Sequence, residues 1–121
     1  MTSILGARDE LDTALSAVMA VADAPGQKPP PCAVIFGEGA GDLDHIARGQ
    51  YTARFRITLL SGAWDVESSG RILTGLVAQA IGVVVALAGW RLDEVRRDNV
   101  ITIGGGNMLG ADVIASRMVD I

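Results

Sequence analysis

The sequence predicts an α+β domain with two layers, in which a mostly antiparallel four-stranded sheet carries two helices packed on one face. Three patterns lead to this prediction. Apolar residues recur at helical spacing near the N-terminus, apolar and polar residues alternate over 51–59, and two more alternating segments flank a glycine run near the C-terminus. The 121 residues show no break in composition, so we expect a single domain over 1–121.

The first helix is expected from about residue 4 to residue 22. Ser3 is a suitable N-cap, and the apolar positions with helical spacing are Ile4, Leu11, Leu15, Val18 and Ala22. The following segment, 23–31, contains all four prolines of the chain, which end the helix and hold the backbone extended. The apolar residues from Cys32 to Phe36 then predict a short strand.

The glycine-rich stretch 37–49 has few apolar residues and is expected to be a long mobile loop. The alternation after it predicts a strand over 51–59, with its apolar side facing the helices. The opposite face of the sheet is then expected to carry polar residues of this strand and of the last strand, namely Arg54, Arg56, Thr58, Asp112 and Ser116.

The second helix is expected to follow the turn 61–63, with Asp65 or Glu67 in its first turn and Gly89 as its end. Its uncharged stretch, 72–90, approaches the roughly 20 residues that span a bilayer. A membrane helix is therefore one alternative. Polar residues and glycines inside the stretch, together with the strand-like flanks, favour a helix covered by its own sheet and by neighbouring subunits.

Two alternating segments after this helix, joined by Gly104-Gly105-Gly106-Asn107, predict a β-hairpin. The expected order is thus helix, strand, strand, helix, strand, strand. The helices need an apolar surface to pack on and the sheet offers one, which is why we expect both helices on the same face.

The charge and the cysteine and histidine content exclude several classes of protein. Fourteen acidic residues against ten basic ones give a net charge of −4, which argues against a domain that binds nucleic-acid phosphates tightly. The same charge is compatible with an acidic lining past which DNA slides. Cys32 and His45 are the only residues of their kinds, so we expect neither an intramolecular disulfide nor a Cys/His metal cluster. No secretory signal is evident, and we expect a cytoplasmic, reducing environment.

Motifs that would indicate catalysis or a cofactor are incomplete. The run Gly37-Glu38-Gly39-Ala40-Gly41 departs from the dinucleotide-binding spacing, and the glycines 104–106 lack the Lys-Ser/Thr of a phosphate loop. Cys32 and His45 have no evident orienting partner for nucleophilic catalysis. Glu38, Asp42 and Asp44 lack the spacing of a calcium loop. We therefore predict no enzyme activity, no cofactor and no metal.

Several segments together carry a family resemblance. They are the amphipathic N-terminal helix, Pro29-Pro30-Pro31 before a short strand, the strand Arg54-Phe55-Arg56-Ile57-Thr58-Leu59, the helix end Ala86-Leu87-Ala88-Gly89-Trp90-Arg91, and the C-terminal hairpin from Val100 to Ile121. In the order of these elements and in their residue patterns, the chain resembles the tail terminator, or tail completion, proteins of long-tailed siphophages. The resemblance covers nearly the whole chain.

The resemblance implies a structural virion protein that closes into a hexameric ring on the finished tail tube, ends tube polymerisation and offers a surface for joining to the head. Its partners would be further copies of itself, the tail tube protein and a head-completion or connector protein. DNA would pass through the lumen without sequence-specific binding, and no membrane would be involved. The protein would lie at the head-proximal end of the tail after assembly in the host cytoplasm.

A ring requires that one surface of each subunit meets a different surface of the next. The charged residues predicted to make subunit or tube contacts are Glu38, Asp42, Asp44, Arg54, Arg56, Arg91, Arg96 and Arg97. Two other functions stay open. A head-tail connector or head-closure protein would also form a ring, and a small cytoplasmic ligand-binding domain would instead contain a concave pocket with convergent polar groups.

Overall fold

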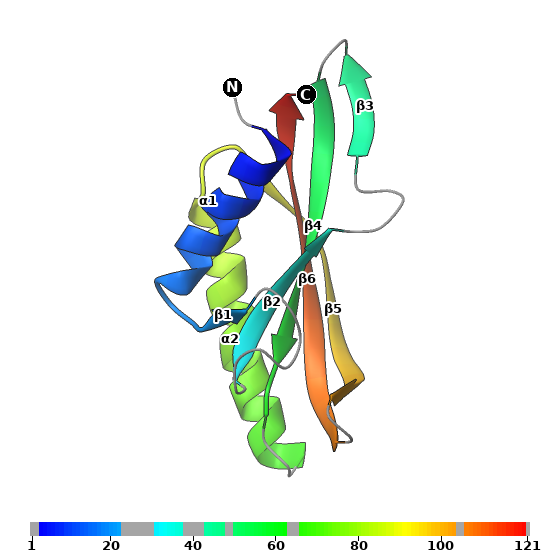
Figure 1. Cartoon of the computed structure of the whole chain (residues 1–121). Helices are drawn as coiled ribbons and strands as arrows, with labels where there is room; N and C mark the ends of the chain where they lie inside the picture. The colour runs from blue at the N-terminus through cyan, green and yellow to red at the C-terminus, as the bar shows by residue number, and fades with distance from the viewer. Residues whose placement is uncertain are drawn as a thin grey trace.

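Figure 1 shows the computed structural model of the chain, whose described residues are 3–22, 31–37, 43–47, 50–62, 66–103 and 106–120. Its elements in chain order are α1 (Ile4–Ser16), β1 (Val21–Ala22), β2 (Cys32–Gly37), β3 (Leu43–Ala47), β4 (Gln50–Leu60), α2 (Val66–Ala86), β5 (Trp90–Ile103) and β6 (Gly106–Asp120). The α+β class predicted from the sequence is confirmed.

The predicted four-stranded antiparallel sheet is wrong, because the sheet is mixed and has more strands. Its main path is β1-β2-β4-β6-β5, and β3 pairs with β4 beside that path. β1 and β2 are parallel, whereas the other pairs are antiparallel. The sequence pattern missed β1 because two residues are too few to show alternation, and it missed β3 because glycines surround that strand.

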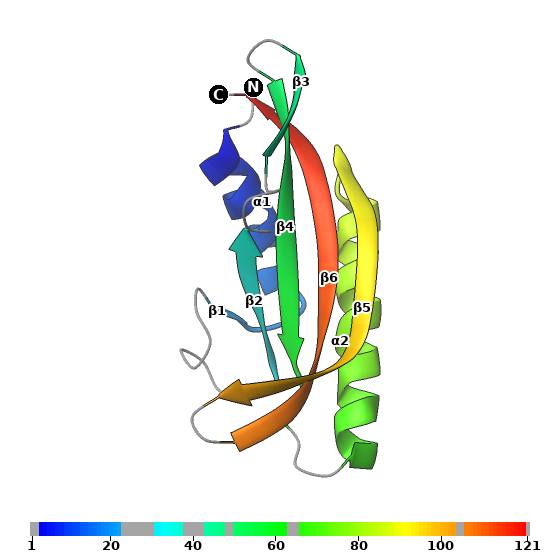
Figure 2. The same ribbon diagram turned by 90° about the vertical axis from the view of Figure 1, so that its right-hand side faces the viewer.

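Both helices lie on one face of the sheet, and no described element covers the whole of the other face (Figures 1 and 2). α2 packs mainly on β5 and β6, and α1 contacts β1, β6 and α2. The main core fills the space between the two layers, and its largest fully buried side chains include Leu11, Leu15, Ile57, Leu59, Leu73, Val84, Val113 and Val119. The helix side of the sheet is therefore buried, whereas the other side is partly accessible: Arg91, Glu94 and Arg96 are exposed there, but Thr58, Ile114 and Ser116 are buried.

The first helix starts where it was predicted but ends earlier. Ser3 accepts a hydrogen bond from the Gly6 backbone N–H at 3.0 Å, as an N-cap does. The helix ends at Ser16 rather than near residue 22. The N–H groups of Val18 and Met19 still donate to the Leu15 carbonyl, and Val21 and Ala22 then join the sheet as β1. The N–H of Ala33 donates to the carbonyl of Ala20 at 2.8 Å, which ties the chain to β2 just before β1 begins.

β4 is the central strand, and its predicted alternation is confirmed. Ala53, Phe55, Ile57 and Leu59 are buried in the main core. β6 pairs with one edge of β4 along its whole length, whereas β3 and β2 share the other edge, β3 along the first half and β2 along the second. Part of the predicted 37–49 loop is therefore strand, and residues 38–42 and 48–49 lie outside the described residues.

The predicted C-terminal hairpin is confirmed as the antiparallel pair of β5 and β6. The register of β5 shifts twice, between Leu92 and Glu94 and between Arg96 and Asn99. Such bulges bend a strand and increase its twist. The tip of the hairpin accordingly bends away from the helices, across the open side of the sheet (Figure 2).

α2 spans Val66–Ala86, and Gly89 after it has a φ of 85°, a left-handed conformation that glycine adopts without strain. This position confirms the predicted end of the second helix. Among the described helices, none has the length and apolar character needed to cross a bilayer.

A candidate interaction surface on the open sheet face

The open face of β4, β6 and β5 carries closely spaced charged residues. Three cross-strand rows form this charged face: Arg54, Ser116 and Arg91; Arg56, Ile114 and Glu94; and Thr58, Asp112 and Arg96. Strand alternation brings the β4 and β6 members to this side, because neighbouring core residues point to the helices. The polar residues predicted for this face are therefore found there.

A bulge at Asp93 decides which charges of β5 reach the charged face. Arg91 is opposite Ser116 and Leu92 is opposite Ala115, but the next pair joins Glu94 to Ile114, so Asp93 is an extra residue. Without that extra residue, Arg91 and Glu94 would point to opposite faces, since they are three positions apart. The bulge thus gathers charges of both signs along one edge of the face.

Polar contacts hold several of these side chains in place. Thr58 Oγ1 donates to Asp112 Oδ1 at 2.8 Å across β4 and β6. On β5, Arg91 Nε donates to Asp93 Oδ1 at 2.7 Å, and Arg96 Nη2 donates to Glu94 Oε2 at 3.0 Å. The contacts order the charged face, although pairs at this exposure contribute little to folding stability.

The hydrogen bond from Arg96 lowers the pKa of the Glu94 carboxyl below its ordinary value of 4.5, and the positive charge of Arg96 acts in the same direction. The carboxylate is therefore retained as the pH falls below 4.5, and its pairing with Arg96 is lost only as the pH passes through the lowered pKa. Glu94 is a charged group at every pH near neutrality.

A shallow hollow of about 200 Å³ lies between β4 and β5 on this face, lined by Arg54, Arg91, Asp93, Glu94, Arg96 and Ile114. Three arginines against two carboxylates give its lining a net positive charge. Pockets for drug-sized ligands are larger, about 300–1,000 Å³, and mostly apolar. The hollow fits a single charged side chain better than it fits an organic ligand.

Arg56 links the charged face to a second, smaller apolar cluster. Its guanidinium lies 4.9 Å from the centroid of the Phe36 ring, a cation–π distance. Its Nε is buried and has no hydrogen-bond partner among the described residues. The neighbouring cluster on this side of β1, β2 and β4 consists of Ala22, Cys32, Val34 and Leu60. The side chain of Cys32 is buried in this cluster.

The structure brings together three of the predicted contact residues, Arg54, Arg91 and Arg96, around the hollow. Arg56 lies one row from Arg54. Asp44 lies in β3 opposite Thr52, and Arg97 lies in β5, but their side chains are outside the described part of the structure. Glu38 and Asp42 also fall outside the described residues. The contact function of the whole set stays a prediction.

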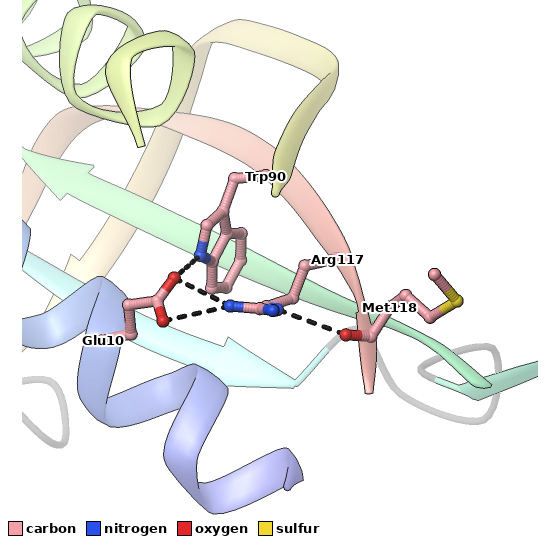
Figure 3. Close-up of polar contacts among 4 residues, drawn as sticks. All are labelled: Glu10, Trp90, Arg117 and Met118. Carbon is pink, nitrogen blue, oxygen red and sulfur yellow. Dashed lines mark hydrogen bonds and ion pairs between the residues drawn. The ribbon is translucent and has the colours of Figure 1, made fainter. Parts of the chain in front are cut away.

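On the helix side, sequence reasoning missed a polar cluster that joins α1 to the C-terminal hairpin (Figure 3). The Trp90 indole N–H donates to Glu10 Oε1 at 2.6 Å, and Arg117 Nη1 donates to both oxygens of Glu10 at 2.8 and 3.0 Å. Arg117 Nε also donates to the Met118 carbonyl at 3.2 Å. Glu10 and Arg117 are 107 positions apart, so no sequence spacing indicated their contact.

The comparisons with known proteins leave the family open. No family model matches the chain, and no curated protein matches it. A solved structure with some similarity is that of the type 4 fimbrial biogenesis protein PilO from Pseudomonas aeruginosa, at 10% identity and a TM-score of 0.46. The match covers 100% of this chain and 72% of that one. A likeness this distant assigns no function and gives no support to the tail terminator resemblance.

Proposed function

We propose that this protein is a structural subunit of a homo-oligomeric ring, and that its charged face makes the contact between neighbouring subunits. The observation that supports the proposal is a sheet with helices on one face only, whose other face presents ordered charges of both signs. Complementary charges of this kind fix orientation and register between protein surfaces. A ring uses two different surfaces of each subunit, so the charged face would meet another part of the next copy.

We infer further that the ring is the tail terminator of a long-tailed phage, a hexamer that caps the tail tube and receives the head. This step is supported by the resemblance of the sequence to tail terminator proteins in the order of its elements and in their residue patterns. The other partners in this proposal are the tail tube protein and a head-completion or connector protein. The overall negative charge of the chain, −4, is compatible with DNA passing through the lumen without being held.

Ring formation and the contact surface are tested together with Arg54→Glu. Arg54 is on β4 at the hollow, so reversing its charge is expected to weaken subunit contacts while leaving the fold intact. We expect light scattering of the wild-type protein to show mass rising with concentration from the 12.6 kDa subunit towards a hexamer. The Arg54→Glu protein is expected to stop short of a ring at the same concentrations.

The matched control is Arg71→Glu, which makes the same charge change at an exposed position of α2, on the other side of the sheet. It is expected to assemble like the wild type. Circular dichroism of all three proteins checks the fold. If Arg54→Glu assembled like the wild type, the charged face would be excluded as the subunit contact. If Arg71→Glu lost assembly as much as Arg54→Glu, the loss would be explained by the change in net charge alone.

A further inference from the structure

β5 forms one edge of the sheet and has 14 residues. Within the described residues, no strand pairs with its outer side. A long strand edge presents backbone N–H and C=O groups that can pair with another chain. Between its two register shifts β5 runs regularly, with Glu94, Val95 and Arg96 opposite Ile114, Val113 and Asp112. This short regular segment is the part of the edge best shaped to add a strand.

The charges around this segment have an antisymmetric order. The sequence 93–97 reads Asp-Glu-Val-Arg-Arg, with acids before Val95 and bases after it. If two copies of the strand run antiparallel and centre on Val95, residue 94 of each copy lies opposite residue 96 of the other. Glu94 then meets Arg96 twice, within the regular segment between the two register shifts. A parallel arrangement would place like charges side by side.

We propose that two copies of this protein pair through the β5 edges, antiparallel and centred on Val95, so that one sheet continues across the dimer. The side chains of Glu94 and Arg96 are 51% and 45% exposed and lie on the same face of the sheet. In the dimer, the two Glu94 and the two Arg96 side chains alternate around a square, so that each carboxylate lies next to a guanidinium. Val95, partly buried against the main core, lies opposite its own copy, where two β-branched side chains can pack.

Backbone hydrogen bonds between the two edges supply most of the attraction in this arrangement, and the charges select the register and the partner. Exposed charge pairs alone are weak, so the charges could not hold the dimer together without the backbone hydrogen bonds between the two strands. The contact is isologous, with the same strand on both sides. It uses the edge of β5 and shares Glu94 and Arg96 with the charged face, but it does not rest on the ring proposal. It also covers an edge that the free subunit would otherwise leave open.

The register makes a specific prediction about charge reversal. Glu94→Arg places an arginine at position 94 opposite Arg96, and Arg96→Glu places a glutamate at position 96 opposite Glu94. Each change turns two attractive pairs into two repulsive ones, so each is expected to weaken dimerisation about tenfold or more. Mixing the two variants restores opposite charges at both pairs, and so does combining both substitutions in one chain.

The experiment uses native mass spectrometry and sedimentation velocity on the full chain. At a concentration at which the ring has not formed, the wild type, the double variant and Arg71→Glu are expected to dimerise, and each single variant is expected to be monomeric. An equimolar mixture of the single variants is expected to give the mixed dimer at that concentration. Because the two single variants differ in mass, the mixed dimer is identified directly. Absence of a wild-type dimer, dimerisation of the single variants like the wild type, or a mixture that stays monomeric would each overturn the proposal.

Discussion

Replacing Trp90 by alanine is expected to lower the free energy of unfolding by about 3–5 kcal/mol, the usual cost of removing a large buried aromatic side chain. The Trp90 ring packs against Phe55, with centroids 5.7 Å apart and planes tilted by 49°. Its N–H also donates to Glu10 on α1 (Figure 3). Urea unfolding followed by circular dichroism measures the change. A domain of this kind is stable by only about 5–15 kcal/mol, so the loss is a large fraction of the total.

Trp90→Phe is the matched control, because it keeps an aromatic ring next to Phe55 but removes the N–H donor to Glu10. Its expected cost is smaller, about 1–3 kcal/mol, the penalty for an unmade hydrogen bond to a partly buried group together with some lost packing. If the phenylalanine variant were as stable as the wild type, the hydrogen bond from Trp90 to Glu10 would not contribute to holding the hairpin to α1.

Leu11→Ala is expected to cost about 2–5 kcal/mol, because Leu11 is fully buried where α1 packs on the sheet and its removal leaves a cavity. The same helix offers its own control. Leu5 is 67% exposed, and Leu5→Ala is expected to change stability by less than about 0.5 kcal/mol. Thermal and urea unfolding of the two variants compare a core position with a surface position of one element. Similar losses at both would contradict the orientation of α1.

Packing on one face of the sheet is what makes the charged face available. The helices bury the apolar side of β4, β5 and β6 and leave the side that carries Arg54, Arg91 and Arg96 to solvent. Substitutions in the core therefore test the scaffold, whereas Arg54→Glu and the charge reversals at Glu94 and Arg96 test surfaces. A variant that loses assembly without losing stability separates the two.

Several features of the fold were predictable because they follow from local patterns. The alternation along β4 predicted which residues face the helices, and Ser3 and Gly89 marked a helix start and a helix end. The glycine run before Asn107 predicted the hairpin. Each of these depends on residues that are close in sequence, where backbone preference and side-chain periodicity decide the structure.

Other features depend on contacts that no local pattern contains. β1 has two residues, and its strand geometry comes from pairing with β2 across the proline-rich segment. The bulge at Asp93, which places Glu94 on the charged face, appears only when the register with β6 is known. The sequence predicted Arg91 and Arg96 as contact residues from their charge, but not the hollow that they form with Arg54. Side-chain clusters across strands require the register first.

Termination of tail tube growth, the proposed function, can be measured by adding the protein to polymerising tail tube protein from the same genome. The proposal predicts short tubes, each with a ring at one end in negative-stain electron microscopy, and longer uncapped tubes with Arg54→Glu. A ring that forms in solution but leaves tube length unchanged would contradict a terminator and favour a head-tail connector. Unchanged tubes without any ring would contradict the assembly function as a whole.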